Sequence, residues 1–168
     1  KIEELINNKT PFLFTGNAVE VLGKYIENED GTNIEGLGIF EVYAKRNMLQ
    51  RFNCLYLGKY EDIEILGFKS QFTMLYGDNS KNYFADTEMG IGINNTTKLE
   101  GIKENNFFGT YVIGPLLILN PLFTEKLLKI MGIEEPKIAF REDVMAAYEE
   151  RLRSCLLYTS PSPRDKRQ

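Results

Sequence analysis

The most constraining feature of this sequence is a strand, a sharp turn and the start of a helix within residues 11–23. The apolar run at residues 12–14 precedes the turn at Gly16, and apolar residues then recur at helical spacing as far as Ile26. In many α/β enzymes such a turn exposes a nucleophilic side chain beside a parallel sheet. We therefore expect an α/β fold with a buried parallel strand, and a turn that carries no reactive group.

Composition limits the chemistry further. The chain contains no histidine, so no Ser–His or Cys–His pair can be assembled from it. Its net charge of −4 gives no electrostatic basis for nucleic-acid binding. No apolar run reaches the roughly 18 residues of a membrane-spanning helix. Outside the final segment Cys54 is the only cysteine, which is typical of a reducing cytoplasm. These features predict a cytoplasmic globular protein.

The two ends of the chain look different from its middle. Residue 1 is a lysine within an amphipathic segment, which predicts that the opening strands of the sheet are missing. Residues 155–165 resemble a translated sequencing adaptor, and the alternative is a disordered tail rich in Ser, Pro and Arg. We expect a partial domain at residues 1–154 and a non-native tail at residues 155–168.

The middle of the chain is rich in β-branched and aromatic residues separated by short turns, which favours a mixed or antiparallel region. Strand-like runs occupy residues 38–43, 52–57, 63–68, 107–112 and 116–119. Helical patterns occupy residues 122–131 and 142–153. The predicted class is α/β, with a parallel core and a mixed or antiparallel extension of the sheet.

Four stretches, in this order along the chain, together resemble a known family. They are Gly-Asn-Ala-Val-Glu-Val-Leu-Gly at 16–23, Glu-Gly-Leu-Gly-Ile-Phe at 35–40, Gly-Phe-Lys-Ser-Gln at 67–71, and Gly-Thr-Tyr-Val-Ile-Gly-Pro-Leu-Leu at 109–117 with Asn-Pro at 120–121. Residues 9–128 thus resemble the CobB/CobQ-like class I glutamine amidotransferases, in particular the GatD-type group. The resemblance implies a flavodoxin-like three-layer sandwich, incomplete at its N-terminus, without a cofactor or a metal.

The sequence departs from this family where the chemistry takes place. In the family an elbow cysteine attacks the carboxamide of glutamine, and the histidine before Gly-Pro is its base. The matching positions here are Gly16 and Ile113, and a third family histidine position holds Gln71. The motif glycines are present while the reactive side chains are absent. The resemblance therefore implies the scaffold of a glutaminase without its activity, a pseudoenzyme.

A remnant of the substrate pocket is still expected. The Asn17 N–H, at the start of the predicted helix, would supply half of an oxyanion site and favour weak binding of an anion or glutamine. The residues that the resemblance assigns to this pocket are Gly16, Asn17, Ala18, Glu20, Gln71 and Tyr111.

Three functions remain open from the sequence. The first is a non-catalytic subunit that docks on a Mur-ligase-like (MurT-type) synthetase in peptidoglycan precursor amidation. The second is an active glutamine amidotransferase, if Gly16 is a sequence error or a base lies outside this segment. The third is a stand-alone small-molecule binding module on the same scaffold.

Two other groups of residues are candidate reactive sites. Cys54 lies in an apolar, strand-like run, which favours a half-buried structural residue over a nucleophile. Asp78, Asp86 and Glu88 surround a Gly-Asp-Asn-Ser loop, which favours solvated carboxylates over a cation site.

Overall fold

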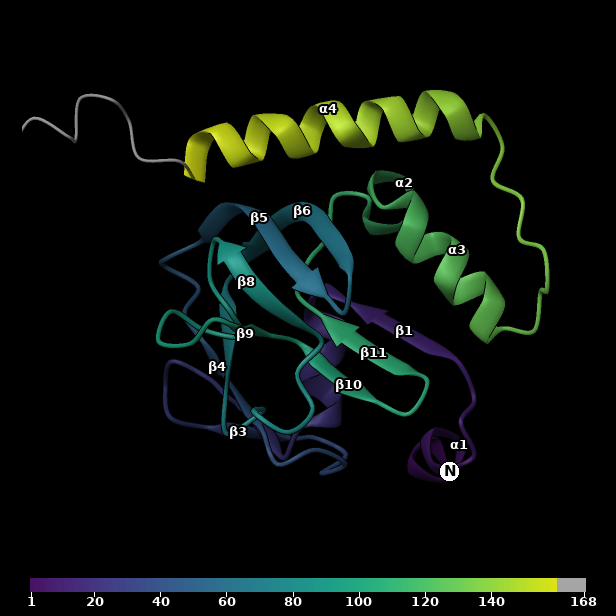
Figure 1. The fold of residues 1–168 in the computed structure, drawn as a ribbon. Helices are drawn as coiled ribbons and strands as arrows, with labels where there is room; N and C mark the ends of the chain where they lie inside the picture. Colours follow the sequence, from purple (N-terminus) through teal and green to yellow (C-terminus); the bar gives the residue numbers. More distant parts are fainter. Residues whose placement is uncertain (160–168) are drawn as a thin grey trace, which may run out of the picture.

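The computed structural model describes residues 1–159, which form three small sheets flanked by helices (Figure 1). The strands are β1 Phe12–Thr15, β2 Tyr25–Glu27, β3 Asn33–Glu35, β4 Tyr43–Arg46, β5 Phe52–Tyr60, β6 Ile63–Gln71, β7 Thr73–Tyr76, β8 Ala85–Met89, β9 Leu99–Glu100, β10 Ile102–Glu104 and β11 Phe107–Thr110. The helices are α1 Ile2–Asn7, the 3₁₀ helix η1 Gly16–Leu22, α2 Leu116–Leu119, α3 Pro121–Ile130 and α4 Arg141–Thr159. The predicted α/β class is confirmed.

The first sheet, in the order β1-β11-β10, contains the parallel pair expected from the sequence. β1 runs parallel to β11, from Phe12 opposite Phe107 to Thr15 opposite Thr110. The Phe14 ring packs edge-on against Phe107, whereas Leu13 packs against a separate core cluster that includes Phe108 and Phe123. β1 is therefore apolar on both faces, as parallel strands require, although it lies at the edge of this sheet and is only half-buried.

The other two sheets form the mixed and antiparallel extension. β5 and β6 make a long antiparallel hairpin, from Phe52 opposite Gln71 to Tyr60 opposite Ile63, and β8 and β9 continue that sheet. The remaining sheet has the order β3-β2-β4-β7, in which only β2 and β4 are parallel. The expected extension is thus confirmed.

Three of the predicted elements are corrected. Residues 116–119 form helix α2 instead of a strand, because Gly114 at φ +98° turns the chain and Pro115 is the N-cap residue directly before the helix. The predicted helix after the elbow is the short 3₁₀ helix η1, so Ile26 lies in β2. Residues 38–42 form a loop, and the strand expected there begins at Tyr43.

The Asn-Pro pair of the fourth motif fastens the helices to the sheet. Asn120 is fully buried, and its side-chain oxygen accepts a hydrogen bond from Leu66 N at 2.7 Å. Its amide nitrogen donates to Leu66 O and Leu116 O, both at 2.7 Å. All of its side-chain polar atoms are therefore hydrogen-bonded. Pro121 begins α3 at the first helical position, where a backbone N–H would have no acceptor within the helix, so proline loses no hydrogen bond there.

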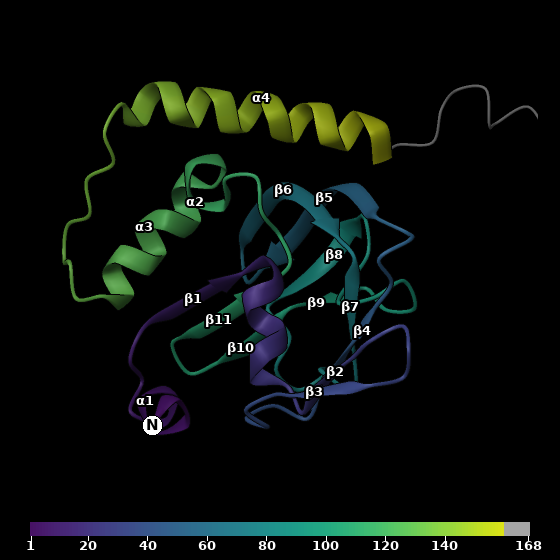
Figure 2. The same ribbon diagram turned by 180° about the vertical axis from the view of Figure 1, so that it is seen from behind.

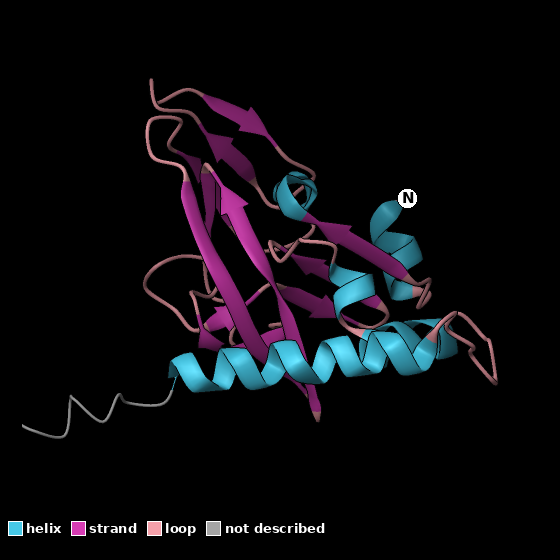
Figure 3. Cartoon of the chain, turned by 90° about the horizontal axis from the view of Figure 1, so that it is seen from above, coloured by secondary structure: helices cyan, strands magenta, loops and turns pink. Residues whose placement is uncertain are grey.

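Helix α4 crosses the outside of α2, α3 and the β5–β6 hairpin (Figure 2, Figure 3). Tyr148 and Cys155 on this helix pack against Leu66 in a small core cluster. α4 continues past residue 154 to Thr159, while residues 160–168 lie outside the described part, so the boundary expected at 154 stays a prediction. Within residues 1–159 no helix has the length and apolar character that crossing a bilayer requires.

Candidate degenerate active site

Gly16 forms the elbow between β1 and η1. Its φ is +62°, in the left-handed region that glycine adopts without a Cβ penalty. A Cβ built on Gly16 would lie 3.7 Å from Cγ2 of Ile113, an ordinary van der Waals contact. The structure therefore places side by side the two positions that the resemblance matches to the nucleophile and the base of the family, and that match stays a prediction.

Ile113 is held at this point by β6. Phe68 and Ile113 exchange two backbone hydrogen bonds, of 3.0 Å from Phe68 N and 2.9 Å from Ile113 N. A Cβ on Gly67 would lie 2.3 Å from Cγ1 of Val112 and 2.9 Å from Ile113 O. Glycine at 67 is therefore required for the strand to approach, which explains its place in the motif.

A buried carboxyl group lies behind the elbow. Glu20, on η1, is 1% exposed, and its Oε1 accepts a hydrogen bond of 3.2 Å from the hydroxyl of Tyr111. Burial raises the pKa of Glu20, opposed by that hydrogen bond and by the charge of Arg46. Burial and the neighbouring Glu20 raise the pKa of Tyr111 well above its usual value. The pair joins η1 to the end of β11.

Gln71 ends β6, a strand that packs against η1. It is 3% exposed, and its Nε2 donates to Thr73 O at 2.8 Å. Within the described residues, Oε1 of Gln71 is buried without a hydrogen-bond partner. The hydroxyl of Thr73 lies near the Glu20 carboxylate instead and opposes the rise of the Glu20 pKa.

The remaining residues assigned to the pocket are not enclosed. Asn17 and Ala18 are exposed on η1, whereas Glu20, Gln71 and Tyr111 are buried. The structure pairs Gly16 with Ile113 and Glu20 with Tyr111. The substrate-pocket role of these residues stays a prediction.

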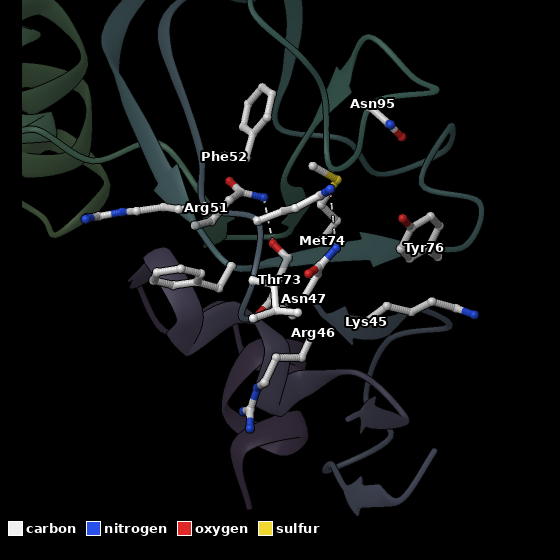
Figure 4. A pocket seen from close by; sticks show the side chains of 13 residues that line it. Lys45, Arg46, Asn47, Arg51, Phe52, Thr73, Met74, Tyr76 and Asn95 are labelled. Carbon is white, nitrogen blue, oxygen red and sulfur yellow. Dashed lines mark hydrogen bonds between the residues drawn. The ribbon is translucent and has the colours of Figure 1, made fainter. Parts of the chain in front are cut away.

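Gln71 and Thr73 also line a cavity of about 750 Å³ (Figure 4). Lys45, Arg46 and Arg51 line it, together with aromatic and neutral polar side chains, and the described lining contains no Asp or Glu. Sequence reasoning missed this cavity. The signal available was a short run of basic residues between 45 and 51 in a chain of net charge −4.

Sequence reasoning also missed a buried ion pair at the third residue of the Gly-Phe-Lys-Ser-Gln motif. Lys69 and Glu100 are both fully buried and form a salt bridge. Lys69 Nζ also donates to Ile91 O and Gly92 O, at 2.9 and 2.6 Å. The lysine inside the otherwise apolar part of β6 was the available signal, because a lysine is almost never fully buried without a partner.

The other oxygen of Glu100 continues this network into β11. Its Oε1 accepts hydrogen bonds from the Thr110 hydroxyl and from Tyr111 N, both at 2.8 Å. The ion pair therefore links β6, the loop at residues 91–92, β9 and the segment that leads to Ile113.

The other candidate reactive residues, Cys54 and the loop carboxylates, have surroundings typical of structural or solvated side chains. Cys54 is half-buried in β5, and burial raises the pKa of its thiol. Asp78 accepts a hydrogen bond from Ser80 N, and Asp86 accepts one from the Tyr83 hydroxyl. Residues 1–159 contain no group of three His, Cys, Asp or Glu side chains arranged to hold a metal ion.

Comparison with known proteins supports the reading of the motifs. No family model matches the chain. Over 128 residues, 76% of this chain, it is 30% identical to the lipid II isoglutaminyl synthase (glutamine-hydrolyzing) subunit GatD of Staphylococcus aureus, covering 52% of that protein. Over 152 residues, 86% of this chain, it is 26% identical to the subunit of the same name from Streptococcus pneumoniae, covering 58% of it.

The chain thus spans little more than half the length of these two curated relatives. The aligned part nevertheless includes most of this chain, and the elbow, the Gly67 approach and the Asn120 anchor give the shared motifs a structural reason. The resemblance inferred from the motifs is confirmed: the chain is a homologue of GatD-type amidotransferase subunits.

Proposed function

We propose that this chain is a glutamine amidotransferase-like subunit in lipid II amidation that lacks glutaminase activity and docks on a Mur-ligase-like, MurT-type synthetase. The observation that carries the loss of activity is Gly16 lying opposite Ile113. Covalent hydrolysis of glutamine at an elbow needs a side-chain nucleophile to attack the carboxamide carbon and a base to take its proton. Neither glycine nor isoleucine offers such a group.

The backbone around this point supports a role for the scaffold. The positive φ at Gly16, the close approach at Gly67 and the pairing of Phe68 with Ile113 are all in place. A surface built from them can still be recognised by a protein partner, because docking depends on shape and surface chemistry and does not require a thiolate. In this role the synthetase would use free ammonia.

The test uses the full-length protein and a MurT-type, Mur-ligase-like synthetase. We expect no release of ammonia from glutamine by either protein alone or by the mixture. We expect the two proteins to co-elute in size-exclusion chromatography, and the pair to amidate lipid II with ammonium chloride but not with glutamine. Glutamine-dependent ammonia release, or separate elution, would contradict the proposal.

A second function, an active amidotransferase with cysteine at position 16, is favoured by one observation. A Cβ at Gly16 meets nothing closer than Ile113 Cγ2 at 3.7 Å, so a cysteine side chain has room there. A long sequencing read across this codon decides between the two, because a cysteine codon would convert the subunit into a candidate enzyme. The histidine position would still be filled by Ile113.

A further inference from the structure

Phe140, directly before α4, departs from local preference in three ways. Its carbonyl oxygen accepts the first hydrogen bond of the helix, from Val144 N at 3.0 Å, at a position that favours Ser, Thr, Asp or Asn as a side-chain cap. Its φ is +54°, in the left-handed region that a bulky side chain rarely adopts. Phe140 is 80% exposed and belongs to none of the core clusters of the described residues. Local preferences broken without a gain in packing indicate a residue that serves an interaction.

The chain on both sides of Phe140 is acidic. Four exposed carboxylates flank it: Glu134, Glu135, Glu142 and Asp143. None of the four forms a salt bridge within residues 1–159. The two basic residues of this stretch are Lys137 and Arg141, and Arg141 is already paired with Glu125 at 2.6 Å. Phe140 and these four carboxylates, here called the knob, therefore present an apolar ring within a negative surface.

Only part of this negative charge has a role within the chain. Glu142 and Asp143 lie in the first turn of α4, where carboxylates favour the helix dipole. Glu134 and Glu135 lie in the connection between α3 and α4 and make no such contact with a helix start. The charge of the connection is therefore free to face a partner of opposite charge.

The cavity at β4, β5, β6 and β7 presents the opposite surface. Its volume is about 750 Å³, within the range of pockets that enclose an organic group. Phe52, Phe72 and Met74 are half-buried and line it, and the described lining contains no Asp or Glu. The Arg51 guanidinium lies 5.6 Å from the Phe72 ring, so a cation adjoins the apolar wall. These four residues are here called the socket.

The charges around the socket suit a protein surface better than a single ion. In Figure 4 the charged ends of Lys45, Arg46 and Arg51 extend toward different sides of the cavity. Lys45 is paired with Glu27 at 3.3 Å, and Arg46 faces the buried Glu20. Arg51 bonds only to the hydroxyl of Ser70 through Nε, at 2.8 Å, within residues 1–159. Arg51 is therefore the cation left for a carboxylate that lies beside an inserted apolar group.

The knob and the socket lie on opposite sides of the molecule. In Figures 1 and 2 the connection between α3 and α4 forms one outer edge, and β4 lies toward the other edge. One copy of the chain therefore does not reach its own socket with its own Phe140. A contact between the two surfaces joins two copies head to tail, because each copy contributes a different surface.

We propose that Phe140 of one copy inserts into the socket of a second copy, with its ring against Phe52 and Phe72 and its neighbouring carboxylates near Arg51. An aromatic anchor in an apolar pocket, with charges at the rim, is the usual construction of a protein interface. A membrane is a poorer partner for the knob, since an anionic lipid surface repels its carboxylates. The contact involves this chain alone and is independent of docking on a synthetase.

The test is sedimentation velocity of the full-length protein alone, between about 1 and 100 µM, where a contact of micromolar Kd is populated. We expect the average mass to rise with concentration and to exceed that of a dimer, because each head-to-tail contact leaves one knob and one socket free. The association should weaken as salt increases, since salt screens charges at the rim. A monomer at every concentration would overturn the proposal.

Two variants remove one surface each. Phe140→Asn removes the ring, and Arg51→Glu reverses the charge of the socket; each should weaken association at least about tenfold, as loss of an interface anchor does. Phe140→Asn should unfold at the same or a higher temperature than the parent, because asparagine tolerates a positive φ and caps a helix. Weaker association of this variant therefore cannot come from a weaker fold.

Mixing the two variants is the decisive step. Phe140→Asn keeps its socket and Arg51→Glu keeps its knob, so an equimolar mixture should form a heterodimer that does not extend further. Ile118→Ser, at an exposed apolar residue of α2, and Lys59→Glu, at a cation of the β5–β6 hairpin outside the socket, are the controls and should associate as the parent does. A mixture that stays monomeric, or controls that lose association equally, would contradict the assignment.

Discussion

The elbow and the Lys69–Glu100 network lie beside neighbouring residues of β6, Phe68 and Lys69. Reactive polar side chains are absent from the first, whereas charged side chains are buried and paired in the second. At the elbow, Gly16 and Ile113 hold the positions that the resemblance matches to a thiol and an imidazole, and a Cβ added at Gly16 would lie 3.7 Å from Ile113 Cγ2. At the network, two full charges are buried, and each is satisfied by several partners. Polar side chains are thus present and paired where they join structural elements, and they are absent from the two positions at the elbow.

The difference follows from the cost of each change. A solvent-accessible nucleophile at a turn with positive φ contributes nothing to folding, and glycine there avoids a backbone cost of about 1 kcal/mol. A buried charge that loses its partner is strongly destabilising. A fold without reactive side chains at these two positions can therefore stay intact, whereas loss of one member of the ion pair is expected to destabilise it.

The largest expected effect is on stability, from Lys69→Ala. This change leaves Glu100 buried without its cation and should lower the free energy of unfolding by about 3–5 kcal/mol. Urea unfolding followed by circular dichroism measures it. Lys59→Ala, which breaks an exposed contact of 3.9 Å with Glu64, is the control and should change stability by less than about 1 kcal/mol. Similar losses of unfolding free energy in the two variants would mean that the buried ion pair stabilises the fold no more than the exposed contact does.

A second prediction concerns the close approach of β6. Gly67→Ala places a Cβ 2.3 Å from Cγ1 of Val112, so the strand must shift away from the segment that carries Ile113. We expect a loss of about 1–3 kcal/mol, typical of overpacking. Gly16→Ala, where the added atom meets only Ile113 at 3.7 Å, should cost only about 1 kcal/mol, from the positive φ. If Gly16→Ala lowered the urea midpoint more than Gly67→Ala, backbone strain at the elbow would cost more than the overpacking beside β6.

The elbow geometry also makes a chemical prediction. Gly16→Cys combined with Ile113→His places a thiol beside an imidazole, the pairing that lowers a cysteine pKa. The double variant should be alkylated by a glutamine-analogue chloroketone at least about tenfold faster than Gly16→Cys alone, because His lowers the thiol pKa. Intact-protein mass spectrometry measures the adduct. Equal rates would mean that the two positions, though adjacent, are not aligned for proton transfer.

The smallest effect is the pH dependence contributed by Glu20. Burial raises its pKa above the ordinary value of 4.5, so the folded state binds the proton more tightly than the unfolded state. Stability from this group is therefore complete below about pH 4.5 and is lost as the pH rises through the folded pKa, with a slope of at most about 1.4 kcal/mol per pH unit.

Glu20→Gln tests this pH dependence, since glutamine occupies the matching position in the family motif. Urea unfolding between pH 4 and 8 should show a flatter profile for the variant and an equal or higher stability at pH 7. A variant that is less stable than the parent at pH 7 would mean that the Glu20 carboxylate is favourably charged in the fold, through Arg46 and Tyr111.

Local sequence predicted those elements whose causes are local. The apolar run before Gly16 predicted the parallel strand β1, and the helical pattern at residues 122–131 predicted α3, which starts one residue earlier at Pro121. The long hairpin of β5 and β6 followed from two β-rich runs separated by a short turn. The strand predicted at residues 116–119 was wrong because a short apolar run fits a strand or a helix equally well. The turn at Gly114 and the proline at 115 precede the helix that forms there.

Sequence by itself determined that no histidine-based chemistry exists in this chain, that an elbow is present without a nucleophile, and that the scaffold is α/β of the GatD-type. Tertiary structure alone decided that Gly16 meets Ile113, that Lys69 finds Glu100, and that Arg46 and Arg51 line one cavity beside Thr73. The physical reason is that each of these contacts joins residues far apart along the chain. Propensity and periodicity act over a few residues, whereas the packing of separate sheets places such side chains together.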